Sequence, residues 1–151
     1  MSRRRGIRLL WICLIGITTA FIWGQSLMNA SDSGAESGAV QQWLVLLFGD
    51  GFAETFLYVY LRKVAHFSEY AVLGVTWSGW RNARPPLKRA KWLVYFAGIL
   101  TATCDELLQF IAPGRGPAVT DVLIDTAGYA VGALLWWGLV SLIRRKKNAK
   151  K

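Results

Sequence analysis

Five ionisable side chains lie inside stretches of this chain that are otherwise apolar. They are His66, Glu69, Asp105, Glu106 and Asp125. Carboxylates and imidazoles act as general acids and bases in enzymes, and they also bind divalent cations. Inside a membrane each charge is unfavourable, by about 2.5–3.5 kcal/mol near the bilayer centre and by less toward helix ends. Several charged side chains at one depth of the membrane therefore predict a polar pocket that opens to one face of it.

The spacing of the polar residues predicts that they share helix faces. Lys63, His66 and Tyr70 occur at i, i+3 and i+7, while Asp105 and Gln109 occur at i and i+4. Both spacings place side chains on one side of an α-helix. We therefore expect two helices to present polar stripes to the pocket.

A third helix is expected to combine a polar half with a packing half. Asp121, Asp125, Gly128 and Gly132 occur at i, i+4, i+7 and i+11, which is one side of a helix. The Gly-x-x-x-Gly spacing at 128–132 allows a neighbouring helix to approach closely. This face is therefore predicted to carry carboxylates in the first turns of the helix and to pack against another helix in the turns that follow.

The composition indicates a membrane protein that crosses the bilayer several times. Of the 151 residues, 54% are hydrophobic and 18% are charged, and there are 8 Trp. A net charge of +9 in a soluble domain would suggest a nucleic-acid partner. Here the basic residues lie between and beyond the apolar segments, so the predicted partner is the lipid bilayer and not nucleic acid. Cys13 and Cys104 lie in apolar segments and are expected to be small core residues.

Four apolar segments approach the ~20 residues that a helix needs to cross the hydrocarbon core. They lie at about 7–28, 64–80, 92–112 and 122–143. We therefore predict an all-α polytopic membrane protein, a single domain over 1–151 with four transmembrane helices in a small bundle. The first segment could also be a cleaved signal peptide, but its apolar run is longer than the usual core of such a peptide, which favours an uncleaved helix.

The distribution of basic residues predicts the orientation, because lysine and arginine are enriched in cytoplasmic loops. The segments before the first span, between the second and third, and after the fourth hold 15 of the 18 basic residues and none of the 9 acidic ones. Both termini are therefore expected in the cytoplasm, with 144–151 as a basic cytoplasmic tail. In that orientation the second, third and fourth spans all carry their polar residues near the outer side.

The predicted outer loop, 29–63, has two parts of different composition. Residues 29–39 are rich in Ser, Gly and Ala, which is typical of a flexible linker. Residues 41–61 are apolar and aromatic, with a Gly-Asp-Gly turn signal at 49–51. We expect short helices here that lie in the outer membrane interface and cover the bundle.

Two blocks of sequence carry a family resemblance. The first is the Lys-x-x-His-x-x-x-Tyr pattern at 63–70, within the segment 61–74. The second is Asp-Glu-Leu-Leu-Gln at 105–109, followed by Arg115 and by the segment 121–128. Together these blocks resemble the VanZ-like family of membrane proteins, over about residues 7–143. Where the family pattern often has Asn, this chain has Asp125, which adds a negative charge.

The resemblance implies a location and a biological setting. The founding member of the VanZ-like family is associated with low-level teicoplanin resistance in glycopeptide-resistant Gram-positive bacteria. A similar protein is expected in the bacterial cell membrane and connected with the cell envelope. The resemblance implies no particular reaction.

The first functional hypothesis is an external pocket that binds or modifies an outer-leaflet lipid or a lipid-linked cell-wall precursor. Lys63 and Arg115 would contact phosphate or carboxylate groups of the ligand. His66 and the carboxylates would orient the headgroup or act as acid and base. The candidate ligand-binding residues are Lys63, His66, Tyr70, Asp105, Glu106, Gln109, Arg115, Asp121 and Asp125, and the candidate catalytic residues are His66, Glu69, Asp105, Glu106 and Asp125.

Two other hypotheses stay open. Four carboxylates and one histidine could hold Mg²⁺, Mn²⁺ or Zn²⁺ in a metal-dependent hydrolase or transferase, although no spacing such as His-Glu-x-x-His is present. Alternatively, the protein is a non-enzymatic accessory or scaffold whose charged cluster is structural. In that case Lys63 or Arg115 would neutralise a carboxylate, His66 would bond to Asp125, and Asp121 would cap a helix.

Overall fold

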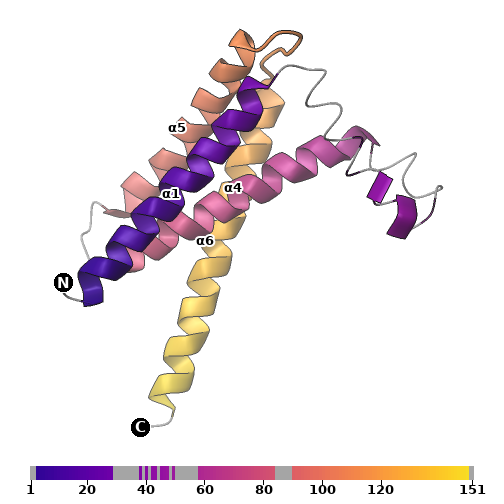
Figure 1. Cartoon of the computed structure of the whole chain (residues 1–151). Helices are drawn as coiled ribbons and strands as arrows, with labels where there is room; N and C mark the ends of the chain where they lie inside the picture. Colours follow the sequence, from indigo (N-terminus) through magenta and orange to yellow (C-terminus); the bar gives the residue numbers. More distant parts are fainter. Residues whose placement is uncertain are drawn as a thin grey trace.

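The computed structural model consists of long α-helices. It describes residues 3–28, 58–83 and 90–149, together with 38, 40, 42, 43, 45–47 and 49. The helices are α1 (Arg3–Leu27), α4 (Tyr58–Asn82), α5 (Ala90–Ile111) and α6 (Val119–Asn148) (Figure 1). No strand occurs among the described residues, so the predicted all-α class is confirmed.

The helices are arranged so that both termini lie at one end of the bundle (Figure 1). The end of α1, the end of α5 and the start of α6 meet at the opposite end, while α4 runs obliquely across α6. The largest interface between two helices is that of α4 with α6. Three helices therefore bring the residues at one end of the bundle together, and α4 crosses close to that end.

Glycines determine how closely α4 and α6 approach. A Cβ atom added to Gly132 would lie 2.6 Å from the carbonyl carbon of Ala71, and one added to Gly128 would collide with the carbonyl oxygen of Phe67. On the other side of the same interface, a Cβ added to Gly74 would lie 2.9 Å from the carbonyl carbon of Tyr129. The Gly-x-x-x-Gly spacing thus produces the close helix contact that the sequence predicts.

Tyr129 fixes α5 against α6. Its ring occupies the space left by Gly98, where an added Cβ would lie 2.5 Å from a ring carbon. Its hydroxyl donates a hydrogen bond of 2.6 Å to the backbone carbonyl of Val94. Tyr129 and Val94 are both almost fully buried, so the polar end of the ring is satisfied inside the apolar core, as a buried tyrosine requires.

The chain reverses direction between α5 and α6 in a short turn. Gly114 has a φ of 76°, a left-handed conformation that glycine adopts at little steric cost, and Pro113 follows the end of α5, where it cannot continue the helix. At the start of α6 the N-cap residue is Ala118, whose side chain forms no cap. The expectation that Asp121 caps this helix is therefore wrong, because Asp121 lies in the first turn of α6.

The cap of α6 comes from α5. Glu106 Oε2 accepts a hydrogen bond of 2.7 Å from the backbone N–H of Ala118. A carboxylate at a helix N-terminus also interacts favourably with the helix dipole. Glu106 is thus held between the end of α5 and the start of α6.

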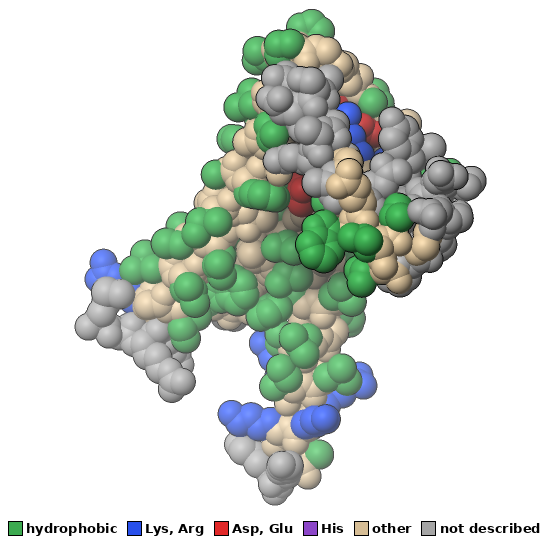
Figure 2. All heavy atoms as spheres, turned by 45° about the vertical axis from the view of Figure 1, so that its right-hand side comes forward, with side chains coloured by type: hydrophobic (Ala, Val, Ile, Leu, Met, Phe, Trp, Pro, Cys, Tyr) green, Lys and Arg blue, Asp and Glu red, His purple; other side chains and the backbone are tan. Residues whose placement is uncertain are grey.

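Three helices have the length and apolar composition of membrane spans: Arg5–Leu27, Trp92–Ile111 and Val119–Asn148. Helix α4 is not among them, since Arg62, Lys63, His66 and Glu69 lower its hydropathy. Its 25 residues would still extend for about 37 Å. Figure 2 shows hydrophobic side chains along the face in view. Basic side chains lie near both ends of the chain and again beside acidic ones in the upper half of this view.

The helix bounds correct one prediction about the outer loop. Residues 58–63 belong to α4, so this helix begins six residues before the predicted span at 64–80 and the loop ends earlier than residue 63. The positive charges of Arg62 and Lys63 suppress the hydropathy of the first turns without breaking the helix. Gly49 has a φ of 83°, which agrees with the turn expected there, whereas most of 29–57, including most of the segment expected to form interfacial helices, lies outside the described residues.

Candidate functional site

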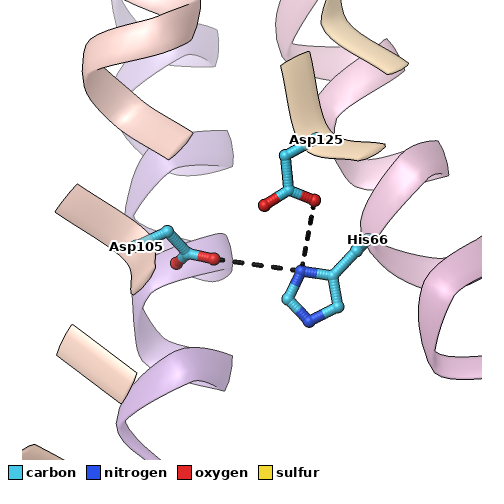
Figure 3. A group of neighbouring side chains, drawn as sticks. All are labelled: His66, Asp105 and Asp125. Atoms are coloured by element: carbon cyan, nitrogen blue, oxygen red, sulfur yellow. Dashed lines mark ion pairs between the residues drawn. The ribbon is translucent and has the colours of Figure 1, made fainter. Parts of the chain in front are cut away.

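Three helices bring His66, Asp105 and Asp125 together (Figure 3). His66 comes from α4, Asp105 from α5 and Asp125 from α6. The Nδ1 atom of His66 lies 3.5 Å from Asp125 Oδ1 and 3.9 Å from Asp105 Oδ2. In Figure 3 both carboxylates face the same nitrogen of the imidazole ring. We call these three residues the His-Asp-Asp cluster.

The His-Asp-Asp cluster is buried, and its oxygens have no hydrogen-bond donors. Asp105 and Asp125 are both 0% exposed, and none of their four carboxylate oxygens accepts a hydrogen bond from a described residue. The hydroxyl of Ser26, at the end of α1, lies beside Asp105 and is also fully buried without a hydrogen-bond partner among the described residues. Such groups are rare in folded proteins, where nearly all buried polar atoms are bonded.

Tyr70 adds a further polar group to the surroundings of the cluster. It is 0% exposed, and its hydroxyl has no hydrogen-bond partner among the described residues. The charges of Asp105 and Asp125 are close enough to act on this hydroxyl. One turn after His66 on α4, Tyr70 therefore places a potential donor near the two carboxylates.

A hydrogen-bonded chain beside the cluster joins α4, α5 and α6. Arg62 Nη2 donates to Gln109 Oε1 over 3.1 Å, and Gln109 Nε2 donates to Glu106 Oε1 over 3.1 Å. Glu106 in turn accepts from Ala118. Gln109 is fully buried, and this chain satisfies both ends of its amide. Glu106 and Gln109 are therefore used to hold the helix ends in place around the cluster.

Arg115 joins the α5–α6 turn to α1. Its Nη1 donates to the backbone carbonyl of Gln25 over 2.9 Å and to that of Ser26 over 3.3 Å. Basic side chains commonly bond to the free carbonyls at a helix C-terminus. The hydrogen bonds of Arg115 thus fix the end of α1, and with it Ser26, against the cluster.

A small cavity lies beside His66, between the first turns of α4 and the first turns of α6. Its volume is about 190 Å³, and it is lined by Arg62, Lys63, His66, Asp121 and Ile124. Pockets for drug-sized ligands measure roughly 300–1,000 Å³, so this cavity has room for a headgroup and not for a whole lipid. We call it the cationic cavity.

A larger cavity of about 410 Å³ lies between α4, α5 and α6 on the side of the termini. Its walls are mainly apolar and aromatic, with Val94, Leu134 and Trp137 among them, and Arg81 lies at the end of α4. None of the described acidic residues lines it. The candidate site residues therefore lie at the smaller cationic cavity and not at this one.

The structure places the residues predicted from the sequence in three groups. His66, Asp105 and Asp125 form the cluster, while Lys63 and Asp121 line the cavity that leads to it. Tyr70, Glu106, Gln109 and Arg115 surround the cluster as described above. Glu69 is not among the residues whose side-chain atoms lie close enough together to bind one ion. Ser26 and Arg62 were not predicted from the sequence as site residues, although Arg62 precedes His66 by four positions and so shares its helix face.

The donor set of the cluster suits a divalent metal ion. One nitrogen of His66 and one oxygen from each aspartate all lie within 4.8 Å of one another. Imidazole and carboxylate are the common ligands of Zn²⁺ and Mn²⁺. His66, Asp105 and Asp125 are the residues that could hold such an ion.

A family comparison agrees with the two sequence blocks. Residues 9–143 match the model of the VanZ/LLP1 family. The chain belongs to the VanZ/LLP1 family. The match covers all of α4 and α5 and most of α1 and α6. No curated protein and no solved structure matches the chain. With three helices long and apolar enough to cross a bilayer, this VanZ/LLP1 protein is a multi-pass membrane protein.

Proposed function

We propose that this VanZ/LLP1 protein binds the anionic headgroup of an outer-leaflet lipid or lipid-linked cell-wall component in the cationic cavity. The observation that supports this most strongly is the position of Arg62 and Lys63 at the wall of a headgroup-sized cavity that ends at His66. Lysine and arginine are the side chains that bind phosphate and carboxylate groups. The headgroup would enter the cavity while its hydrocarbon chains remain in the bilayer.

The charged residues divide into those that attract the headgroup and those that act on it. Lys63 and Arg62 line the cavity, where they balance the negative charge of a phosphate. His66 lies between the cavity and the two buried carboxylates, so it would orient the headgroup or move a proton to or from it. The proposed role in the cell is protection of the envelope against glycopeptides such as teicoplanin.

The orientation required by this proposal has four spans and both termini in the cytoplasm. The positive-inside rule supports it, because Arg144, Arg145, Lys146 and Lys147 follow the last apolar segment. In this orientation the cationic cavity opens on the outside. Helix α4 would be the second of the four spans in chain order, and its first turns would reach the outer headgroups through the long side chains of Arg62 and Lys63.

Labelling of introduced cysteines tests this orientation. In a variant without Cys13 and Cys104, Thr120→Cys places a thiol at the start of α6 and Ala149→Cys places one after its end. A membrane-impermeant maleimide added to intact cells is expected to label Thr120→Cys. The matched Ala149→Cys should react only after the cells are permeabilised. The opposite pattern would place the cavity in the cytoplasm.

Lipid binding tests the cationic cavity itself. Lys63→Ala is expected to weaken the binding of a polyprenyl phosphate by about 10-fold, because a charge-assisted contact contributes roughly 1.5–3 kcal/mol. Binding is measured by titration of the purified protein in detergent, with an uncharged polyprenol as the comparison ligand. Lys147→Ala is the matched control, because the cavity lies at the start of α6 and Lys147 lies near its end. This variant should bind the polyprenyl phosphate as the wild type does. Equal affinities for Lys63→Ala and the wild type would contradict the proposal.

Two alternatives lead to different results. A metal-dependent hydrolase or transferase is favoured by the donor set of the His-Asp-Asp cluster, and it would convert the lipid that it binds. A non-enzymatic scaffold would use the cluster only to join three helices. In that case Asp105→Asn would lower the amount of folded protein and not only its activity.

A further inference from the structure

The distances within the His-Asp-Asp cluster do not match those of direct hydrogen bonds. A charge-assisted hydrogen bond between an imidazolium and a carboxylate measures about 2.7–2.9 Å. The observed separations from His66 Nδ1 are 3.5 Å and 3.9 Å. Two ligand atoms that each lie ~2.0–2.2 Å from a tetrahedral ion are about 3.3–3.6 Å apart. Both separations from His66 Nδ1 are therefore closer to the spacing of two ligands around one ion than to the length of a charge-assisted hydrogen bond.

The charge balance of the cluster also calls for a cation. Asp105 and Asp125 are fully buried and accept no hydrogen bond from any described residue. Arg62, which lines the cavity beside His66, forms its hydrogen bond with Gln109. Burying a carboxylate without a partner is strongly unfavourable. A bound divalent cation would compensate two carboxylates beside a neutral imidazole.

Ser26 and Tyr70 give an independent indication of a missing ligand. Both side chains are 0% exposed, and neither hydroxyl has a hydrogen-bond partner among the described residues. Ser26 reaches the cluster from α1, which supplies none of its three charged members. A cation with a bound water molecule would provide hydrogen-bond partners for hydroxyl groups placed in this way.

The ligand types indicate which ions fit. Mg²⁺ and Ca²⁺ prefer sites made of oxygen ligands, whereas an imidazole nitrogen together with carboxylates suits Zn²⁺ or Mn²⁺. We propose that His66 Nδ1 and one oxygen each of Asp105 and Asp125 bind a divalent transition-metal ion. Three protein ligands leave at least one coordination position free, as in catalytic zinc sites. Because His66 also lines the cationic cavity, this free position lies near the place proposed for the headgroup.

Metal analysis of the purified protein tests this site without any variant. Protein prepared in detergent without chelators is expected to contain one equivalent of Zn²⁺ or Mn²⁺ by mass spectrometry of the elements. After the ion is removed with a chelator, adding back Zn²⁺ or Mn²⁺ should raise the unfolding temperature, and Mg²⁺ should not. A wild-type protein that contains neither ion and whose unfolding temperature responds to neither overturns the proposal.

Two variants locate the ion. Asp125→Asn is expected to weaken metal binding at least 10-fold and to lose the metal-dependent rise in unfolding temperature. The matched control is Asp121→Asn, one turn earlier on α6 and outside the cluster, which should keep its metal. Equal loss in both variants, or in neither, would contradict the assignment of the ligands. The proposal is independent of the lipid, because metal content is measured whether or not a polyprenyl phosphate binds.

Discussion

Gly132→Ala is expected to destabilise the folded bundle by about 3 kcal/mol or more, at the upper end of the usual cost of overpacking. The added methyl group would lie 2.6 Å from the carbonyl carbon of Ala71. The contact is with backbone, which cannot rotate away as a side chain can. Helix α6 would have to move away from α4, and this would disturb the largest helix interface of the molecule.

Gly138 provides the matched control in the same helix. A Cβ added there has no neighbouring atom within 4 Å, so Gly138→Ala should stabilise α6 by up to about 1 kcal/mol through helix propensity. Thermal unfolding of both variants in detergent, followed by circular dichroism, gives the comparison. A Gly132→Ala protein as stable as the Gly138→Ala protein would show that α4 and α6 do not approach as closely as described here.

The face of α6 could be predicted from the sequence because its signals are local. Asp125, Gly128 and Gly132 follow one side of a helix, and the structure buries all three against α4. Likewise, the meeting of His66 with Asp105 and Asp125 follows from topology, since α4, α5 and α6 follow one another along the chain and bring their polar turns to one level. Periodicity and the length of a span were sufficient for both results.

The contacts that complete the site could not be predicted, because they join residues far apart in the chain. Arg62 bonds to Gln109, which is 47 positions away, and Arg115 bonds to Gln25, which is 90 positions away. Nothing in either local sequence specifies its partner. Ser26 was missed for a related reason: one hydroxyl at the end of an apolar span resembles a residue at the membrane surface. The start of α4 was placed too late because hydropathy measures the solvent preference of side chains and not helix formation.

Asp105→Asn is expected to abolish the protective activity of the protein without lowering its amount in the membrane. The amide has the same shape as the carboxylate but neither its charge nor its ability to bind a cation. Losing one partner of a buried charge pair typically costs about 2–5 kcal/mol of binding free energy. This cost corresponds to roughly 30-fold or more in affinity. The helix ends stay joined by the hydrogen bonds from Arg62 to Gln109 and from Gln109 to Glu106, so the amount of protein in the membrane should not fall.

The amount of protein separates this account from a purely structural role. If the His-Asp-Asp cluster served only to join three helices, breaking it would cost about 3–5 kcal/mol of stability, and Asp105→Asn and His66→Ala would fail to accumulate. Membrane abundance of both variants is therefore measured beside their activity. Normal accumulation with lost activity is the expected combination.

The most direct test is the teicoplanin susceptibility of a sensitive Gram-positive host that expresses either the wild type or Asp105→Asn at equal membrane levels. The wild type is expected to protect the host, and Asp105→Asn is not. Protection retained by the variant would contradict a functional role for the buried carboxylate. A wild type that gives no protection would contradict the proposed role in glycopeptide resistance.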